Sequence, residues 1–526
     1  MKKKLILFTL ILAVTQLVKA QAPNWSDNVA SIIYSHCSNC HRAGGLAPFP
    51  LMSFNDVDSN SVSIYDAVLN KVMPPWKADP NYVHFKGEFN LTQQEITDIT
   101  SWINNGKPTG NLANAPAPPV FQVGSQLPAV DMTLNLPVFV VDSVADQYRT
   151  FVVHSNFTSD TYINAVEYVP GNNAIVHHIV IYNDPTSASW NFDQADPAPG
   201  YASNGTMAAS TDAQFMGAWA PGAGIFSFPN NFGIKVPAGA DFLVEVHYAP
   251  GSQGETDSTK VNFKFITANA STREVYFNAL LEYFTGMTDG PLYVPANTVH
   301  TFHEAQPIVQ IGAPISLISF WPHMHRVGTS FKAWAQNLAG DTVRLGYVPA
   351  WDFHWQLIYN YKKLIPLFTD QVIIGEAVYD NTTANTDNPF SPPHDIYSGE
   401  HTTDEMMLGF FAFTIYQSGD ENFIIDSSVA TGNNTIANEP LSVISVYPNP
   451  ASNQLNVNLL LKNESQQTSI KVLNETGVLV YDNNLGRVPT GLRSHRIDID
   501  SWSSGTYFIK VKTSDGEIMT KEFVRQ

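Results

Sequence analysis

Both cysteines of this 526-residue chain lie in one short motif, Cys37-Ser38-Asn39-Cys40-His41. Two thiols followed directly by a histidine suit covalent attachment of a haem, because the thiols can add to its vinyl groups and the histidine can bind the iron. We therefore predict one c-type haem on Cys37 and Cys40, with His41 as the proximal ligand. Since no cysteine remains to pair elsewhere, the other domains must be held by their cores without disulfides.

The second axial ligand of this haem is expected to be Met73. The run Met73-Pro74-Pro75-Trp76 resembles the methionine-bearing loop of cytochrome c domains. A thioether ligand raises the reduction potential relative to a second histidine, which suits an electron carrier. His36 and His84 are the alternative ligands, and a core methionine is the structural alternative for Met73.

Three histidines in the middle of the chain form a first candidate metal-binding set. His177 and His178 are adjacent. On a regular strand adjacent side chains point to opposite faces, so both imidazoles reach one ion only if the strand bends or ends there. His247 shares a strand face with Glu245, which makes Glu245 a candidate acceptor that orients this imidazole. Each histidine also has a structural interpretation as a buried core residue.

Two further histidines and a methionine form a second candidate set. The run His323-Met324-His325 follows an apolar strand, and this spacing puts both imidazoles on one face as a chelate. Met406 closes the run Asp404-Glu405-Met406. Two imidazoles with one thioether suit copper, because the soft sulfur stabilises the cuprous state and imidazole serves both oxidation states. Zinc would more often take a carboxylate or a thiolate in that place.

In their order along residues 120–425, these motifs resemble those of the copper type II, ascorbate-dependent monooxygenases, the family of peptidylglycine and dopamine hydroxylases. The resemblance implies two copper ions and hydroxylation of an activated C–H bond by dioxygen, with water as the second product. It assigns the electron-transfer copper to His177, His178 and His247. It assigns the oxygen-binding copper, and thus catalysis, to His323, His325 and Met406.

Three positions depart from the peptide-processing members of that family. Those members use an arginine two residues before the HxH run, and an asparagine and a tyrosine two and four residues after the methionine, to hold the substrate. This chain has Trp321, Leu408 and Phe410 there. A peptide carboxylate is therefore a poor fit, and a small apolar or aromatic substrate is the better expectation. The absence of the family's usual disulfides leaves the loop geometry open.

The elements that must position these residues fall into four segments. Residues 24–110 are helical, with Thr92 and Glu95 as a capping box, and are expected to form a small all-α cytochrome c-like domain. A proline-rich linker, residues 110–119, follows. Residues 120–270 and 271–426 carry β-rich runs separated by turn residues, which favours two tandem antiparallel β-sandwiches, jelly-roll-like, each with one copper set.

Both ends of the chain indicate export. Residues 1–20 have the three lysines, apolar run and small-residue end of a cleaved signal peptide. Residues 441–526 are expected to form a small β-sandwich, and their motifs, among them Val446-Tyr447-Pro448-Asn449-Pro450, resemble the C-terminal sorting domain of the type IX secretion system. This resemblance implies passage through that machinery across an outer membrane, to release or surface attachment.

Charge and composition exclude some partners and leave two main functions. A formal net charge of −19 disfavours nucleic acid, and no stretch beyond the signal is apolar enough for a transmembrane span. The leading hypothesis is a secreted copper monooxygenase whose electrons, from an external reductant or redox partner, are relayed through the fused haem. The alternative is a non-catalytic electron-transfer or copper-binding surface protein. A plain adhesin would leave the metal motifs without a role.

Overall fold

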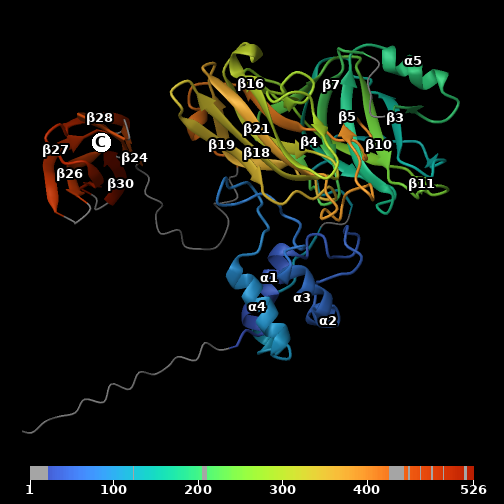
Figure 1. Cartoon of the computed structure of the whole chain (residues 1–526), viewed down its shortest axis with the longest axis horizontal. Coiled ribbons are helices and arrows are strands. Elements are labelled where there is room, and N and C mark those ends of the chain that lie inside the picture. The colour runs from blue at the N-terminus through green and yellow to red at the C-terminus, as the bar shows by residue number, and fades with distance from the viewer. Residues whose placement is uncertain are drawn as a thin grey trace, which may run out of the picture. The chain divides into compact units, whose positions relative to one another are not determined.

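The computed structural model describes residues 22–121, 124–203, 210–425, 443–447, 450–461, 464–474, 478–489, 491–514 and 518–526. The described chain is mainly β, as the sequence predicted, with few and short helices (Figure 1). It divides into two compact units, Met1–Ser427 and Ser428–Gln526. The predicted signal peptide, residues 1–20, lies outside the described residues. Within the described part, no helix is long and apolar enough to cross a membrane.

The N-terminal helices gather in one bundle (Figure 1). They are a π-helical turn Trp25–Val29, α1 (Ala30–His36), α2 (Phe54–Ser59), α3 (Ser61–Leu69) and α4 (Gln93–Asn104), with a 3₁₀ turn Leu112–Asn114 after them. Their core is built around Trp25 and Trp102, whose ring centroids lie 6.1 Å apart. The predicted capping box is confirmed, because Thr92 and Glu95 each accept a hydrogen bond from the backbone N–H of the other.

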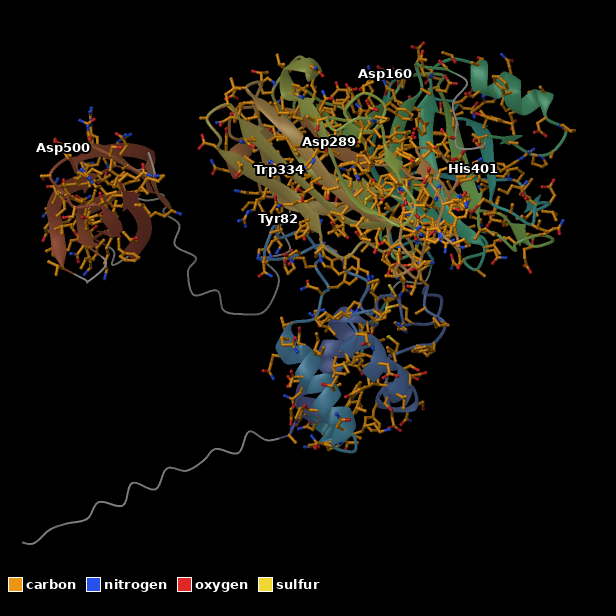
Figure 2. All side chains as sticks on the ribbon, in the orientation of Figure 1. Tyr82, Asp160, Asp289, Trp334, His401 and Asp500 are labelled. Carbon is orange, nitrogen blue, oxygen red and sulfur yellow. The ribbon has the colours of Figure 1, made fainter. Side chains whose placement is uncertain are left out.

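Residues 76–89, which we call the arm, leave the helical core and pack into the neighbouring β-sandwich. Phe85 is buried against Tyr359 and Tyr361, at ring-centroid distances of 5.1 and 5.4 Å. The backbone N–H of Lys86 donates to the carbonyl of Asn360 at 2.7 Å. Tyr82 lies beside this sandwich as well, 5.7 Å from the ring of Tyr347 (Figure 2). Sequence patterns had placed the whole arm inside the helical domain.

We expect Phe85→Ala to lower the free energy of unfolding of this unit by about 3 to 5 kcal/mol, because the change removes a buried aromatic ring and leaves a cavity. Urea denaturation followed by tryptophan fluorescence measures the effect. The matched control is Val120→Ala, at a side chain that is 97% exposed, and it should shift the value by less than about 0.5 kcal/mol. Equal effects of the two variants would contradict the packing of the arm.

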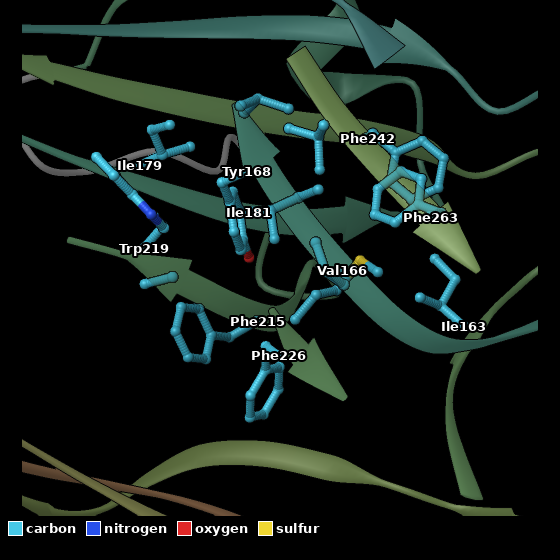
Figure 3. Close-up of a cluster of buried hydrophobic side chains, with 14 of the residues drawn as sticks. Ile163, Val166, Tyr168, Ile179, Ile181, Phe215, Trp219, Phe226, Phe242 and Phe263 are labelled. Atoms are coloured by element: carbon cyan, nitrogen blue, oxygen red, sulfur yellow. The ribbon is translucent and has the colours of Figure 1, made fainter. Parts of the chain in front are cut away.

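The first β-sandwich consists of two sheets whose inner faces share one core, as Phe242 stacking on Phe263 illustrates (Figure 3). One sheet contains β1 (Met132–Asn135), β4 (Thr161–Val169), β8 (Phe226–Ser227), β9 (Phe232–Val236), β12 (Lys260–Ile266) and β13 (Arg273–Glu274). The other contains β3 (Gln147–His154), β5 (Val176–Asp184), β6 (Tyr201–Ala202), β7 (Gln214–Trp219) and β10 (Asp241–Tyr248). A strand pair, β2 (Phe139–Val140) with β11 (Thr256–Asp257), and helix α5 (Ala188–Ala195) complete it.

The second β-sandwich repeats this two-sheet plan. One sheet contains β14 (Tyr276–Glu282), β17 (Ile315–His323), β20 (Tyr359–Leu367) and β23 (Leu408–Ile415). The other contains β16 (Val299–Pro307), β18 (Gly328–Asn337), β19 (Thr342–Val348) and β21 (Gln371–Asp380). Smaller elements are the pair β15 (Tyr293–Val294) with β22 (Ile396–Tyr397) and the 3₁₀ turns Ile308–Ile311 and Asp420–Asn422. Strand pairing thus changes from the first sandwich to the second between β13 and β14.

The two sandwiches are packed against each other. Residues of the second, including Ile318 and Trp321, belong to the same buried cluster as the core of the first. Arg273 binds both carboxylate oxygens of Asp420, at 2.6 and 2.8 Å, and both side chains are buried. Bidentate pairing of this kind holds two surfaces in one orientation. Residues from both sandwiches can therefore contribute to one site.

The unit Ser428–Gln526 is a separate small two-sheet β domain. One sheet contains β24 (Val443–Tyr447), β25 (Gln454–Leu461) and β28 (Gly491–Asp498). The other contains β26 (Ser465–Asn474), β27 (Leu479–Val488), β29 (Gly505–Lys512) and β30 (Ile518–Arg525). Strands of both sheets contribute to its core, with Leu455 and Val457 from the first and Ile470 and Phe523 from the second.

Candidate metal centre

A β-bulge brings the first histidine set together. His247 on β10 pairs with His178 on β5, whereas the next residue, Tyr248, pairs with Val176, so His177 is the extra residue of the bulge. The bend that two adjacent ligands require is therefore present. The Nδ1 atom of His178 lies 3.3 Å from the Nδ1 atoms of both His177 and His247. One ligand nitrogen from each of the three lies within 4.8 Å of the others.

The surroundings of this set favour the neutral imidazole at His177 and His178 and orient the ring of His247. Burial, assisted by the neighbouring His247, lowers the pKa of His177 to about 3. Burial also lowers the pKa of His178 well below its usual value. The Nε2 atom of His247 lies 2.8 Å from a carboxylate oxygen of Asp146, which leaves Nδ1 for a metal. Neutral imidazole is the form that binds metal ions, so these side chains fit a copper ion.

The second set begins where β17 ends. The Nδ1 atom of His323 lies 2.5 Å from the side-chain oxygen of Gln356, and that of His325 lies 3.1 Å from the carbonyl oxygen of Asp404. Each contact fixes the tautomer and leaves Nε2 available. Burial lowers the pKa of His323 to about 4 and that of His325 to about 3. The two ring centroids are 5.3 Å apart.

The segment that carries Met406 is bound to the same turn. The Glu405 carboxylate accepts hydrogen bonds from the backbone N–H groups of His325, at 2.9 Å, and Val327, at 2.7 Å. Burial raises the pKa of Glu405 to about 8. The Tyr379 hydroxyl donates to the carbonyl of Met406 at 2.8 Å. These contacts act on the backbone around Met406 and leave its thioether free to line the cavity described next.

Both sets border one cavity of about 410 Å³. Its lining includes His178 and His247 from the first set and His323, His325 and Met406 from the second. The three positions at which this chain departs from the peptide-processing enzymes, Trp321, Leu408 and Phe410, all line the cavity too. Trp321 and Phe410 stack at 4.8 Å and form an aromatic wall. Among the described residues that line this cavity there is no lysine or arginine.

Sequence patterns missed the residues that orient the ligands. Asp146 and Gln356 lie far from the histidines in sequence, in loops without a recognisable motif. Glu245, the sequence-based candidate for orienting His247, instead accepts hydrogen bonds from Ser203 and Thr150. Asp146 takes the role predicted for Glu245, because the loop before β3 brings it to the Nε2 side of His247.

The haem motif follows helix α1. The Nδ1 atom of His41 lies 3.0 Å from the carbonyl oxygen of Phe49, which leaves Nε2 available as an iron ligand. Cys37 and Cys40 are partly exposed free thiols. These residues therefore fit covalent haem attachment. Among the alternative second ligands, His36 has both ring nitrogens engaged, by Phe89 and Glu95, whereas His84 is exposed and bound to Glu88.

The partly buried residue Met73 lies after helix α3, where its backbone N–H donates to the carbonyl of Ala67 at 3.1 Å. Its assignment as the second haem ligand stays a prediction.

Fold and site together define a mainly β protein with a histidine-rich centre between two sandwiches. Two family models match segments of the chain and define its similarities more specifically. Residues 132–254 match the copper type II ascorbate-dependent monooxygenase, N-terminal domain. Residues 445–525 match the secretion system C-terminal sorting domain. The resemblances to the monooxygenases and to the sorting domain are thus confirmed for these segments, whereas the cytochrome c-like domain stays a prediction. The sorting domain indicates an exported protein of the cell surface or outer membrane. The first match includes His177, His178 and His247 and ends before the second set.

Solved structures add only distant similarities. CopC from Methylosinus trichosporium OB3b is 21% identical, over 16% of this chain and 90% of its own, with a TM-score of 0.13. A DUF3244 family protein with an immunoglobulin-like β-sandwich fold from Bacteroides vulgatus is 18% identical, over 16% of this chain and 84% of its own, with a TM-score of 0.14. Scores this low support no structural argument. Among curated proteins, none matches this chain.

We expect Asp146→Ala to weaken copper binding by the first set by about 10- to 100-fold, because His247 loses the acceptor that holds its ring. Asp146→Asn should weaken copper binding less, since its amide oxygen can still accept a hydrogen bond from Nε2 of His247. Competition titration with a copper chelator measures the affinity. Asp142→Ala, in the same loop at an exposed carboxylate, is the control. An unchanged affinity in Asp146→Ala would show that this carboxylate does not position the ligand.

Proposed function

We propose that this chain is a secreted copper-dependent monooxygenase that hydroxylates an activated C–H bond, with electrons relayed through a fused c-type haem. The observation that carries this proposal is the common cavity. Two sets of buried or partly buried imidazoles, one of them accompanied by a methionine, border a single aromatic-walled space. A purely structural role would not require two such sets beside one cavity.

In this proposal His177, His178 and His247 hold one copper ion, and His323, His325 and Met406 hold the other. Bound copper would supply one-electron chemistry with dioxygen. Asp146, Gln356 and the carbonyl of Asp404 keep the ligand rings in the tautomers that leave one nitrogen free. The overall reaction takes one substrate C–H group, dioxygen, two electrons and two protons, and gives one C–OH group and water.

The side chains that line the cavity indicate which class of substrate would fit. Trp321, Phe410 and Phe215 bury an apolar or aromatic group and exclude water from the space beside Met406. A substrate carboxylate would find no cationic side chain among the described lining residues. We therefore propose a small apolar or aromatic substrate, held mainly by burial of its ring or chain.

The haem would be held by Cys37, Cys40 and His41, with Met73 as second ligand. A reductant tethered by a short linker reaches an effective concentration of about millimolar, so an external donor needs to reduce only the haem. The linker itself lies against the helical domain, where Ala115 packs on its core. Just beyond the linker, the ring of Phe121 has its centre 4.3 Å from the Arg42 guanidinium.

The proposal is tested by metal analysis of the purified protein together with oxygen uptake across a panel of aromatic and apolar substrates. We expect two coppers and one haem per chain, and substrate-dependent oxygen uptake matched by hydroxylated product. Copper and haem that cycle between redox states with no substrate-dependent uptake would instead support the non-catalytic electron-transfer or copper-binding protein.

A further inference from the structure

One short loop between β19 and β20, residues 352–356, contacts both histidine sets and the arm. Its first residue, Asp352, forms an ion pair with Lys77 of the arm at 3.1 Å. Its last residue, Gln356, is the acceptor for Nδ1 of His323. The matched family segment, residues 132–254, does not include this loop. The loop thus contacts both histidine sets and, through Asp352, the arm that extends from the predicted haem domain.

Phe353 lies between the two histidine sets. Its ring stacks on His177, with centroids 4.9 Å apart and planes inclined by 23°. The same ring meets His325 edge-on at 6.1 Å. Phe353 also lines the cavity, so its ring occupies part of the space that both sets border. It is therefore a direct aromatic contact between a residue of the first set and a residue of the second.

The loop is held in place by several contacts. The backbone N–H of Trp355 donates to the carbonyl of Asp352 at 2.9 Å, and the Gln356 amide donates to the carbonyl of Phe353 at 2.9 Å. The indole N–H of Trp321 donates to the carbonyl of Gln356 at 3.2 Å. Trp355 also packs so closely on Gly222 of the first sandwich that a Cβ atom there would lie 3.1 Å from the indole. Phe353 is thus fixed in position rather than free to turn away.

We propose that the 352–356 loop is the electron-transfer junction between the haem domain and the two histidine sets, with Phe353 as the contact that the electron crosses. This inference rests on the proposed function. Each transfer would oxidise a ferrous haem, held by Cys37, Cys40 and His41, to the ferric state and would reduce one cupric ion, held by a histidine set, to the cuprous state, and no atom would move. Phe353 is not itself oxidised. Its packed ring replaces empty space between donor and acceptor, and electron transfer is faster through packed atoms than across a gap.

The test uses the full-length protein with its haem and with cupric copper in both sets, without dioxygen or substrate. The haem is reduced by a light pulse with a photosensitiser, and its reoxidation is followed by absorbance. We expect Phe353→Leu to slow this step on the order of tenfold or more, because the smaller side chain leaves a gap beside His177 and His325. Copper content, the cupric electron paramagnetic resonance spectrum and the haem potential should not change, because no ligand is altered.

Two further variants make the result specific. Phe353→Tyr keeps the aromatic ring and should retain the wild-type rate, which separates a loss of contact from a failure to fold. Phe284→Leu alters another phenylalanine of the same cavity, one that is 71% exposed, and should also leave the rate unchanged. Equal rates of haem reoxidation in the wild-type protein and in Phe353→Leu would contradict the proposed role of the 352–356 loop while leaving the proposed function intact.

Absence of any haem-to-copper transfer in the wild-type protein would overturn the junction and the relay together. Oxygen uptake with ascorbate as direct reductant would then still report whether the hydroxylase proposal holds. The two failures are therefore distinguishable.

Discussion

Replacing Met406 with isoleucine is expected to lower substrate-dependent oxygen uptake more than about 100-fold. This loss is larger than the loss of activity that usually follows removal of a residue that only orients a metal ligand. Isoleucine is apolar and similar in size, so the packing of Met406 against the second-sandwich core should largely survive. The contacts that hold this segment, from Tyr379 and Glu405, act on the backbone and are indifferent to the side chain. The variant removes mainly the thioether sulfur.

The measurement is oxygen uptake and product formation at saturating substrate, alongside the copper content of the protein. Reduction and reoxidation of the haem should persist, because the haem motif is untouched. Met407→Leu is the matched control, since it changes a neighbouring thioether that is fully buried in the core and should leave uptake near wild type. A Met406→Ile protein with normal turnover would remove Met406 from the proposed copper site.

The double variant Cys37→Ala, Cys40→Ala is expected to lose covalently bound haem completely. Both thioether links would be removed, and a single imidazole from His41 cannot retain the haem through denaturation. The Nδ1 contact of His41 with Phe49 should remain, because it involves neither thiol. Copper binding by the two histidine sets should also remain, since neither cysteine belongs to them.

Denaturing gel electrophoresis with a haem stain, and the pyridine haemochrome spectrum of the intact protein, measure this loss. Asn39→Ala is the control, because Asn39 lies between the cysteines with an exposed side chain and should keep the haem. Oxygen uptake driven through the haem should disappear in the double variant, whereas uptake with a reductant that reaches copper directly should continue. Wild-type protein without a covalent haem would contradict the motif assignment itself.

Several features of the fold and the site were predicted from residue spacing within short segments of sequence. The capping box at Thr92 was predictable because its hydrogen bonds link residues three apart, so sequence spacing alone defines them. For His323 and His325 strand periodicity predicts one shared face; β17 ends at His323, and the two ring centroids lie 5.3 Å apart although His325 follows the strand. For His177 and His178 the sequence stated only a condition, that the strand must bend. The β-bulge opposite His247 provides this bend, and the bulge exists only because β5 pairs with β10.

Contacts between distant segments could not be predicted in the same manner. Asp146 lies 101 residues from His247, and Gln356 lies 33 residues from His323. Each supplies a single acceptor that many polar side chains could have supplied, so no pattern marks them in advance. The interpretation of Glu245 as the partner of His247 failed for this reason: a shared strand face brings two side chains near each other without deciding which hydrogen bonds they form.

The sequence by itself supplied the candidate metal-binding groups: two thiols with a histidine, five imidazoles and a thioether, at spacings from which two ligand sets and a haem site were predicted. It also determined the mainly β character, because strand periodicity and turn residues act locally, and its motifs made the resemblance to the sorting domain recognisable. Only the tertiary structure decided that both sets border one cavity, that Trp321 and Phe410 wall it, and that Phe353 and the arm connect its parts. These depend on how two sandwiches pack, which is a sum of many long-range contacts that no short stretch of sequence specifies.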